Sequence, residues 1–384
     1  PMMFTTNGFE TYFWDDQSGP QRKVSGVFSK DDLQKLMNRR TERLDLMSVP
    51  IDDKITDRYY QKEAIRAVCG QIQQKFRKHL LVMATGTGKT RTASSLTDVL
   101  SRGKWVTNIL FLADRTALVK QAKDDFKKYL PDMTLCNLCT NKDDRNARIV
   151  FSTYPTILNA IDDTKSSDGR QLFTPAHFDL IIIDESHRSI FKKYRAIFEY
   201  FDAILVGLTA TPKTDIDRNT YDFFEMESGV PTYPYDYETA VYQDHVLVPY
   251  YNYQVKTQFL EEGITYNDLS DEDKERYESD FAEDGPMPEY IPPEKLNKFV
   301  FNEGTVDLVL QDLMERGIKV AGGDRLGKTI IFAQNKLHAQ FILDRFNKLY
   351  PQYHGTFAER VVCEDSRALD VIEDFKVPGK EPHI

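Results

Sequence analysis

The sequence is poor in cysteine and tryptophan: its 384 residues include only four Cys and two Trp. Four thiols are too few to cross-link a chain of this length, so a disulfide framework is excluded. Cys136-Asn137-Leu138-Cys139 has the spacing of a metal or redox site. No second Cys or Cys/His pair accompanies it, which favours ordinary packing for these two cysteines.

Long apolar runs and an excess of positive charge are also missing. No stretch approaches the roughly 20 apolar residues that span a bilayer, and the start, Pro1-Met2-Met3-Phe4, has no basic flank before a hydrophobic signal core. These absences predict a cytoplasmic protein that contacts no membrane. The 50 basic and 60 acidic residues give a net charge of −10, so a nucleic-acid partner would have to bind a local groove.

What the sequence does contain is an alternation of short apolar runs with helical patterns, in a chain long enough for two or more domains. Apolar strands joined by helices predict a parallel sheet that is covered on both faces. The predicted strands are Leu80–Ala84, Asn108–Ala113, Arg148–Thr153, Asp179–Asp184 and Ala203–Gly207, and the predicted helices are Gln61–Lys75, Thr90–Leu100 and Thr116–Tyr129.

A second α/β unit is predicted near the end of the sequence. It comprises strand Lys328–Ala333, helix Leu337–Tyr350, strand Arg360–Cys363 and helix Arg367–Phe375. Between the two units, the stretch Asp271–Pro293 is first highly charged and then rich in proline, which is typical of a solvated insertion or connector.

The stretch Met83–Thr90, "MATGTGKT", follows the first apolar strand and opens a helix. Such a glycine-rich turn is typical of a phosphate-binding loop, whose backbone N–H groups and helix N-terminus bind an anion. Lys89 would reach the β and γ phosphates of ATP, and Thr90 would ligate Mg²⁺. The general pattern has Gly or Ala where this chain has Met83, so a flexible turn is the alternative for this stretch alone.

Asp184-Glu185-Ser186-His187 ends another predicted strand, and ligands bind at the carboxyl ends of the strands in open α/β sheets. Asp184 can hold Mg²⁺, and Glu185 can orient or deprotonate the attacking water. The acidic pair therefore strengthens the prediction of an ATPase. His187, taken alone, is more typical of a structural histidine than of a catalytic one.

In their order along the chain, these motifs resemble superfamily 2 nucleic-acid motors of the DExH type. The matching segments are "ATGTGKT", "FLADRTALVKQ", "VFSTYPT", "DESH", "LTATP" and "KTIIFA". The resemblance implies tandem RecA-like domains and an ATP site formed by Thr85, Gly86, Thr87, Gly88, Lys89 and Thr90. Gln61, in "RYYQ", resembles the residue that reads adenine, and a plain surface residue is its alternative.

The finer resemblance is to the motor (R) subunit of type I restriction enzymes, carried by "TNGFETYFWDD", "FLADR", "STYPTI", "DESHRS" and "GLTATP". It implies that His187, Thr209 and Thr211 couple the nucleotide state to domain position. Arg115 and Thr153 resemble residues that hold DNA phosphates, and a surface salt bridge is the alternative for Arg115. The implied partners are double-stranded DNA and the modification and specificity subunits.

This resemblance also predicts how the chain is divided. Residues 1–50 would follow a nuclease domain, residues 51–248 would form the first RecA-like domain, and residues 249–384 would hold the insertion and an incomplete second one. Asp52-Asp53-Lys54 and Glu272-Asp273-Lys274 lie in polar surroundings and are interpreted as surface charge, not as a nuclease site. The arginine finger and the nuclease site are expected outside this sequence, which predicts weak ATP hydrolysis by the 384 residues alone.

Two alternatives to a DNA translocase remain open from the sequence. One is another superfamily 2 enzyme, such as a helicase or a remodelling motor, because these motifs do not distinguish strand separation from translocation. The other is a non-catalytic scaffold that binds a nucleotide. The presence of Lys89, Asp184 and Glu185 together argues against a scaffold.

Overall fold

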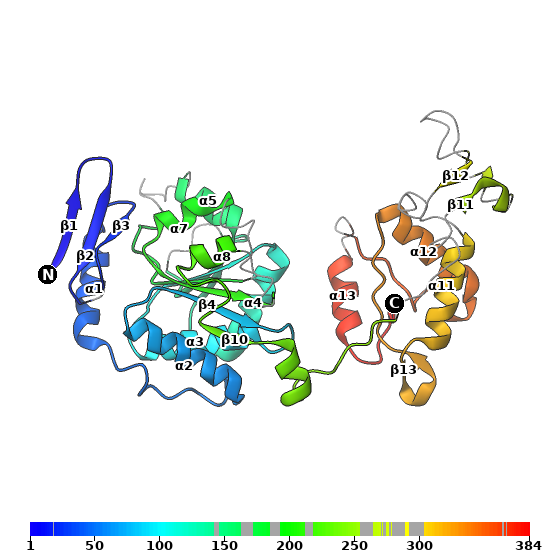
Figure 1. The fold of residues 1–384 in the computed structure, drawn as a ribbon, viewed down its shortest axis with the longest axis horizontal. Helices are drawn as coiled ribbons and strands as arrows, with labels where there is room; N and C mark the ends of the chain where they lie inside the picture. The colour runs from blue at the N-terminus through cyan, green and yellow to red at the C-terminus, as the bar shows by residue number, and fades with distance from the viewer. Residues whose placement is uncertain are drawn as a thin grey trace. The chain divides into compact units, whose positions relative to one another are not determined.

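A computed structural model gives the fold of the chain (Figure 1). It describes residues 1–17, 19–141, 146–162, 172–184, 193–211, 218–253, 264–269, 271, 274–275, 278, 289–291, 303–362, 365 and 367–384. The chain forms two compact units, Pro1–Tyr250 and Tyr251–Ile384. The predicted division at residues 50 and 248 stays a prediction.

The first unit is built on a seven-stranded sheet in which every described pair of neighbours is parallel, in the order β10-β4-β9-β8-β5-β7-β6. All five predicted strands are present in this sheet. The short edge strands β6 and β10 were not predicted from the sequence. The bounds are β4 (Lys78–Met83), β5 (Ile109–Ala113), β6 (Leu135–Asn137), β7 (Ile149–Thr153), β8 (Leu180–Ile183), β9 (Ile204–Thr209) and β10 (Tyr233–Tyr235).

Helices cover both faces of this sheet (Figure 1). Alternate residues of a strand point to opposite faces, and β8 shows the consequence: Leu180 and Ile182 join one core cluster, whereas Ile181 and Ile183 join the other. The parallel, two-faced α/β fold predicted from the sequence is therefore confirmed. One face carries α2 (Tyr59–Gln73), α3 (Lys89–Arg102) and α4 (Thr116–Tyr129), and the other carries α5 (Tyr154–Asp162), α7 (Arg195–Tyr200) and α8 (Arg218–Phe223).

The N-terminal residues form an antiparallel sheet of β1 (Met2–Thr6), β2 (Thr11–Asp15) and β3 (Arg22–Val24), followed by α1 (Lys30–Glu42). Two carboxylates, each just before a strand of the large sheet, bind this N-terminal segment to the first unit. Arg22 donates to Asp202 at 2.7 Å and 2.6 Å, and Arg39 of α1 pairs with buried Asp179.

The second unit contains α11 (Glu303–Arg316), α12 (Lys336–Leu349) and α13 (Ala368–Lys376). The two predicted helices of this unit correspond to α12 and α13 and are confirmed. Arg345 of α12 pairs with Glu303 and Asp307 of α11 and thereby joins the two helices. The short elements are β11 (Ile264–Thr265), η2 (Tyr266–Asp268), β12 (Tyr290–Ile291), β13 (Lys319–Val320), η4 (Ala321–Gly323), β14 (Arg325–Leu326) and η5 (Pro351–Tyr353).

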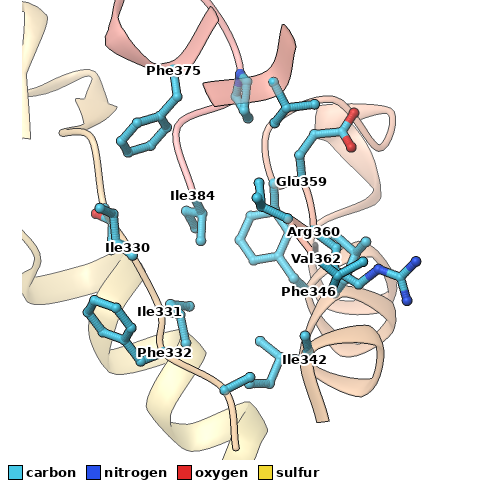
Figure 2. Close-up of a pocket in the computed structure, with 18 of the residues that line it drawn as sticks. Ile330, Ile331, Phe332, Ile342, Phe346, Glu359, Arg360, Val362, Phe375 and Ile384 are labelled. Atoms are coloured by element: carbon cyan, nitrogen blue, oxygen red, sulfur yellow. The ribbon is translucent and has the colours of Figure 1, made fainter. Parts of the chain in front are cut away.

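The two strands predicted for this unit do not form over its described residues, so that part of the prediction is wrong; Cys363 lies outside those residues. The reason is pairing, which runs through the last two residues: His383 accepts from the Thr329 N–H at 2.8 Å and donates to the Phe357 carbonyl at 2.7 Å, and the Ile384 carbonyl accepts from the Glu359 N–H at 3.0 Å. These bonds include none of residues 330–333 or 360–362. Beyond this point the two extended segments line an apolar cavity of about 480 Å³. Figure 2 shows Ile330, Val362 and Ile384 among the residues around it.

Candidate functional site: a phosphate loop braced by α2

The loop between β4 and α3 has the geometry of an anion cradle. Gly86 and Gly88 have φ angles of +87° and +88°, which L-residues with a side chain rarely adopt. Gly88 caps α3, so the N–H groups of the first helical turn, beginning with Lys89, lie directly after the loop. Met83, the departure from the general pattern, is the buried last residue of β4.

The space around both glycines is also limited. A Cβ on Gly86 would lie 3.0 Å from Leu247, and a Cβ on Gly88 would lie 2.5 Å from Nε2 of Gln61. The predicted residues of the loop differ in exposure: Thr85 and Gly86 are exposed, Gly88, Lys89 and Thr90 are half-buried, and Thr87 is buried. The exposed rim and buried base are what a loop needs to receive a polyphosphate from solvent.

The base of the loop is held from inside by Thr87. Its N–H donates to the Ala84 carbonyl at 3.2 Å, and its hydroxyl donates to the same oxygen at 2.6 Å. Its own carbonyl accepts from Gln61 Nε2 at 2.7 Å and from the Tyr60 hydroxyl at 3.0 Å. The loop is therefore fixed to the end of β4 and to the start of α2.

Gln61 is buried, and both ends of its carboxamide are engaged within the protein. Its Nε2 binds Thr87, and its Oε1 accepts from the buried Thr56 hydroxyl. The adenine contact predicted for Gln61 stays a prediction, because an adenine edge would have to compete with these two bonds.

The other predicted residues lie on neighbouring strands of the same sheet. Thr209 is the buried last residue of β9, and its hydroxyl accepts from the Thr211 N–H at 3.1 Å. Asp184 directly follows β8, and its N–H donates to Leu112 at 2.9 Å. In the sheet, β9 lies between β4 and β8. The phosphate loop, Thr209 and Asp184 therefore lie together at the edge of the sheet formed by the carboxyl ends of these strands. Glu185 and His187 lie outside the described residues.

The chemistry of this edge fits a nucleotide with Mg²⁺. Thr90 and Asp184 offer one hydroxyl and one carboxylate oxygen, the hard ligands that Mg²⁺ prefers when it also keeps waters and phosphate oxygens. Among the described ranges, no group of three or more His, Cys, Asp or Glu side chains could form a complete metal cage.

The two residues predicted to contact DNA differ in exposure. Arg115, the N-cap residue of α4, has an 81% exposed side chain, 4.0 Å from the Asp114 carboxylate. Thr153 ends β7 and is buried, and its hydroxyl lies 2.9 Å from that of Thr156 and 3.9 Å from the Cys139 thiol. Arg115 is thus exposed to solvent, whereas Thr153 mainly supports the start of α5. Within the described part of the chain, no helix combines the length and apolarity that crossing a bilayer requires.

Comparison with known proteins agrees with this geometry. The profile of a family described as "Type III restriction enzyme, res subunit" matches residues 54–214. The chain is 38% identical over 198 residues to the type I restriction enzyme EcoAI endonuclease subunit of Escherichia coli, covering 50% of this chain and 23% of that protein. With the EcoKI endonuclease subunit of Escherichia coli strain K12 it is 28% identical over 345 residues, covering 77% and 26%.

The chain spans about a quarter of the length of these two relatives. A solved structure described as a fragment of an HsdR subunit of a type I restriction enzyme from Vibrio vulnificus YJ016 matches with a TM-score of 0.57 at 23% identity. That match covers 100% of this chain and 64% of the other, and at this identity it supports the fold. The resemblance to type I restriction endonuclease subunits is confirmed by these matches.

Proposed function

We propose that the chain carries the motor of a type I restriction endonuclease subunit, which hydrolyses ATP with Mg²⁺ to translocate double-stranded DNA. The observation that carries this proposal is the shared sheet edge of the phosphate loop, Thr209 and Asp184. The similarity to two type I endonuclease subunits supports the restriction context.

In this proposal each residue has a definite task. The N–H groups of Gly86–Thr90 bind phosphate oxygens, and the Lys89 ammonium neutralises the β and γ phosphates. Thr90 and Asp184 hold Mg²⁺, which when bound offsets the charge of the phosphates. Glu185 orients or deprotonates the attacking water. The coupling between the nucleotide state and the position of the domains depends on Thr209, Thr211 and His187.

The DNA-binding part of the proposal depends on backbone contacts. Exposed Arg115 pairs with a phosphate, and Thr153 supports the same region, so the motor can pass over any sequence. Target recognition then belongs to a separate specificity subunit, and cleavage belongs to a nuclease domain; the modification subunit is the other partner. The complex would act in the cytoplasm.

Calorimetry with Mg²⁺ and ATP on the 384-residue protein tests the nucleotide site. We expect ATP binding that requires Mg²⁺ and is lost in Lys89→Ala, because the ammonium contacts the charged phosphates directly. Lys127→Ala, at an exposed position near the end of α4, is the matched control and should bind as the wild type does. Equal affinities in wild type and Lys89→Ala would contradict the phosphate-loop assignment.

Two assays on the full-length subunit separate the alternatives. A triplex-displacement assay reports translocation along duplex DNA, and a strand-displacement assay reports unwinding. Displacement of a triplex without strand separation supports the translocase, whereas strand separation supports a helicase. A full-length subunit that binds ATP without turnover would instead be a nucleotide-binding scaffold.

A further inference from the structure

Tyr60 has contacts that neither adenine recognition nor Mg²⁺ binding explains. Its side chain is buried near the start of α2, and its ring stacks on Tyr235 of β10 with centroids 4.0 Å apart and planes 6° apart. Its hydroxyl oxygen accepts from Arg58 Nη1 at 2.8 Å, and the hydroxyl donates to the Thr87 carbonyl at 3.0 Å. With Arg58 donating to the oxygen, the single phenol proton is left for Thr87.

The bond to Thr87 has a consequence for the next residue in the loop. The peptide unit that joins Thr87 to Gly88 is planar and trans, so its C=O and its N–H point in opposite directions. Two donors from α2, Tyr60 and Gln61, hold the C=O on the α2 side. The Gly88 N–H is thereby turned away from α2. The φ of +88° at Gly88 then leads directly into the first turn of α3.

We infer that Tyr60 is a positioning residue for polyphosphate binding: its hydroxyl fixes the Thr87–Gly88 peptide so that the Gly88 N–H faces the bound anion. This inference rests on the proposed ATP site and deepens it. Tyr60 acts through the backbone of the loop and touches no base. Its effect therefore applies to every nucleoside triphosphate and to inorganic triphosphate alike.

Tyr60→Phe tests the inference because it keeps the ring stacked on Tyr235 and removes only the hydroxyl. We expect the affinity for ATP with Mg²⁺, measured by calorimetry, to fall on the order of fivefold, as for loss of one net hydrogen bond. The affinities for GTP and inorganic triphosphate should fall by the same factor, leaving the ratio of ATP to GTP affinity unchanged. A residue that merely stabilised the fold would lower the melting temperature without this uniform loss.

Tyr235→Phe is the matched control, since its hydroxyl binds Asp244 at 2.6 Å and does not reach the loop. It should preserve both the ring stack and the affinity for ATP. If Tyr60→Phe unfolds at low temperature, Arg58→Met provides a second test that leaves Tyr60 in place. Loss of the donor to the phenol oxygen should then lower the affinities for ATP and GTP by the same factor.

The outcomes separate the inference from the function on which it rests. A wild-type protein that binds no triphosphate overturns both. A wild type that binds ATP, together with a folded Tyr60→Phe protein of equal affinity, overturns only the role of Tyr60. A loss confined to ATP would assign Tyr60 to adenine recognition and would likewise overturn its role in the loop.

Discussion

Arg39 and Asp179 are 140 residues apart in sequence and form a bidentate ion pair between α1 and the start of β8, with one N–H···O distance of 2.7 Å. Both side chains are buried, at 7% and 6% exposure. Asp179 also accepts from the Thr107 N–H at 2.8 Å. Burial alone would raise the pKa of Asp179, but Arg39 and Lys35 lower it below the usual value. The pair therefore joins the N-terminal segment to the sheet as one folded body.

We expect Arg39→Met to destabilise the first unit by about 3 kcal/mol, because the buried Asp179 carboxylate then lacks the cation that pairs with it most closely. Urea unfolding followed by circular dichroism measures the change. The double variant Arg39→Met/Asp179→Asn should recover part of the loss, since the uncompensated charge is then gone.

The exposed pair of Arg195 and Glu199, at 74% and 61% exposure, provides the comparison. Arg195→Met should lower the free energy of unfolding by less than about 0.5 kcal/mol, because solvent screens this pair. Similar costs for Arg39→Met and Arg195→Met would show that burial of the Arg39 pair contributes nothing.

The burial of His79 leads us to expect that the protein loses stability in acid. His79 is completely buried in β4, and burial lowers its pKa to about 4 from 6.5. The unfolded chain therefore binds a proton between these values that the folded chain excludes, so stability is full above about pH 6.5 and decreases as the pH falls toward 4. The contribution to the free energy of unfolding is about 3 kcal/mol over that window.

His79→Phe should remove this contribution. The difference in unfolding free energy between pH 7.5 and pH 4.5, measured in urea, should shrink by roughly 2 to 3 kcal/mol relative to the wild type. His245→Gln, at an exposed position, should keep the wild-type difference. An unchanged pH profile in His79→Phe would mean that His79 accepts its proton in the folded state.

Gly88→Ala should disable the phosphate loop. The new Cβ would meet Gln61 Nε2 at 2.5 Å and would occupy a backbone conformation with φ of +88°. We expect a cost of about 1 to 3 kcal/mol in stability and at least about a tenfold loss of ATP affinity, the equivalent of about 1.4 kcal/mol.

Gly70→Ala is the contrasting substitution, in the last part of α2, where a Cβ meets nothing within 4 Å. It should raise stability by about 0.5 to 1 kcal/mol through helix propensity and leave ATP binding intact. Thermal melts and calorimetry on both variants give the comparison. Tight ATP binding by Gly88→Ala would exclude the cradle geometry.

Duplex DNA should bind weakly, without sequence preference, and with an affinity that falls steeply as salt rises. Arg115→Gln should lower the affinity for unrelated duplexes equally and reduce the slope of log affinity against log salt by about one. Lys128→Gln, at the opposite end of α4, should leave the slope unchanged. Fluorescence anisotropy across a salt series measures both, and a loss restricted to one duplex sequence would argue for base contact by Arg115.

The central strands were predictable because they are buried on both faces. Runs such as Leu180–Ile183 and Ile109–Ala113 contain only apolar residues, and their flanking helices show a clear period. The edge strands β6 and β10 have three residues each and include Asn137 and Pro234, so the sequence carried no such signal. Strand formation at 328–333 depends on a neighbour for pairing, which the local sequence cannot specify.

The candidate site was predictable to a similar extent. The glycines and Lys89 follow from the chemistry of phosphate binding, and the order of the strands brings Thr209 and Asp184 to the same edge. The role of Tyr60 was not predictable, since an aromatic residue at the start of a helix usually signals packing. Its bond to Thr87 joins positions 27 residues apart and depends on where α2 meets the loop.

The ion pairs of Asp179 and Asp202 bear on how the protein can be dissected for expression. The family match begins at residue 54, but the cations that compensate these carboxylates include Arg22, Lys35 and Arg39, which precede it. A piece trimmed to the matched region would keep both acids and discard most of their counter-ions. The family match and the ion pairs thus give different boundaries, and a piece designed to fold by itself should start at the first strand, β1, rather than at residue 54.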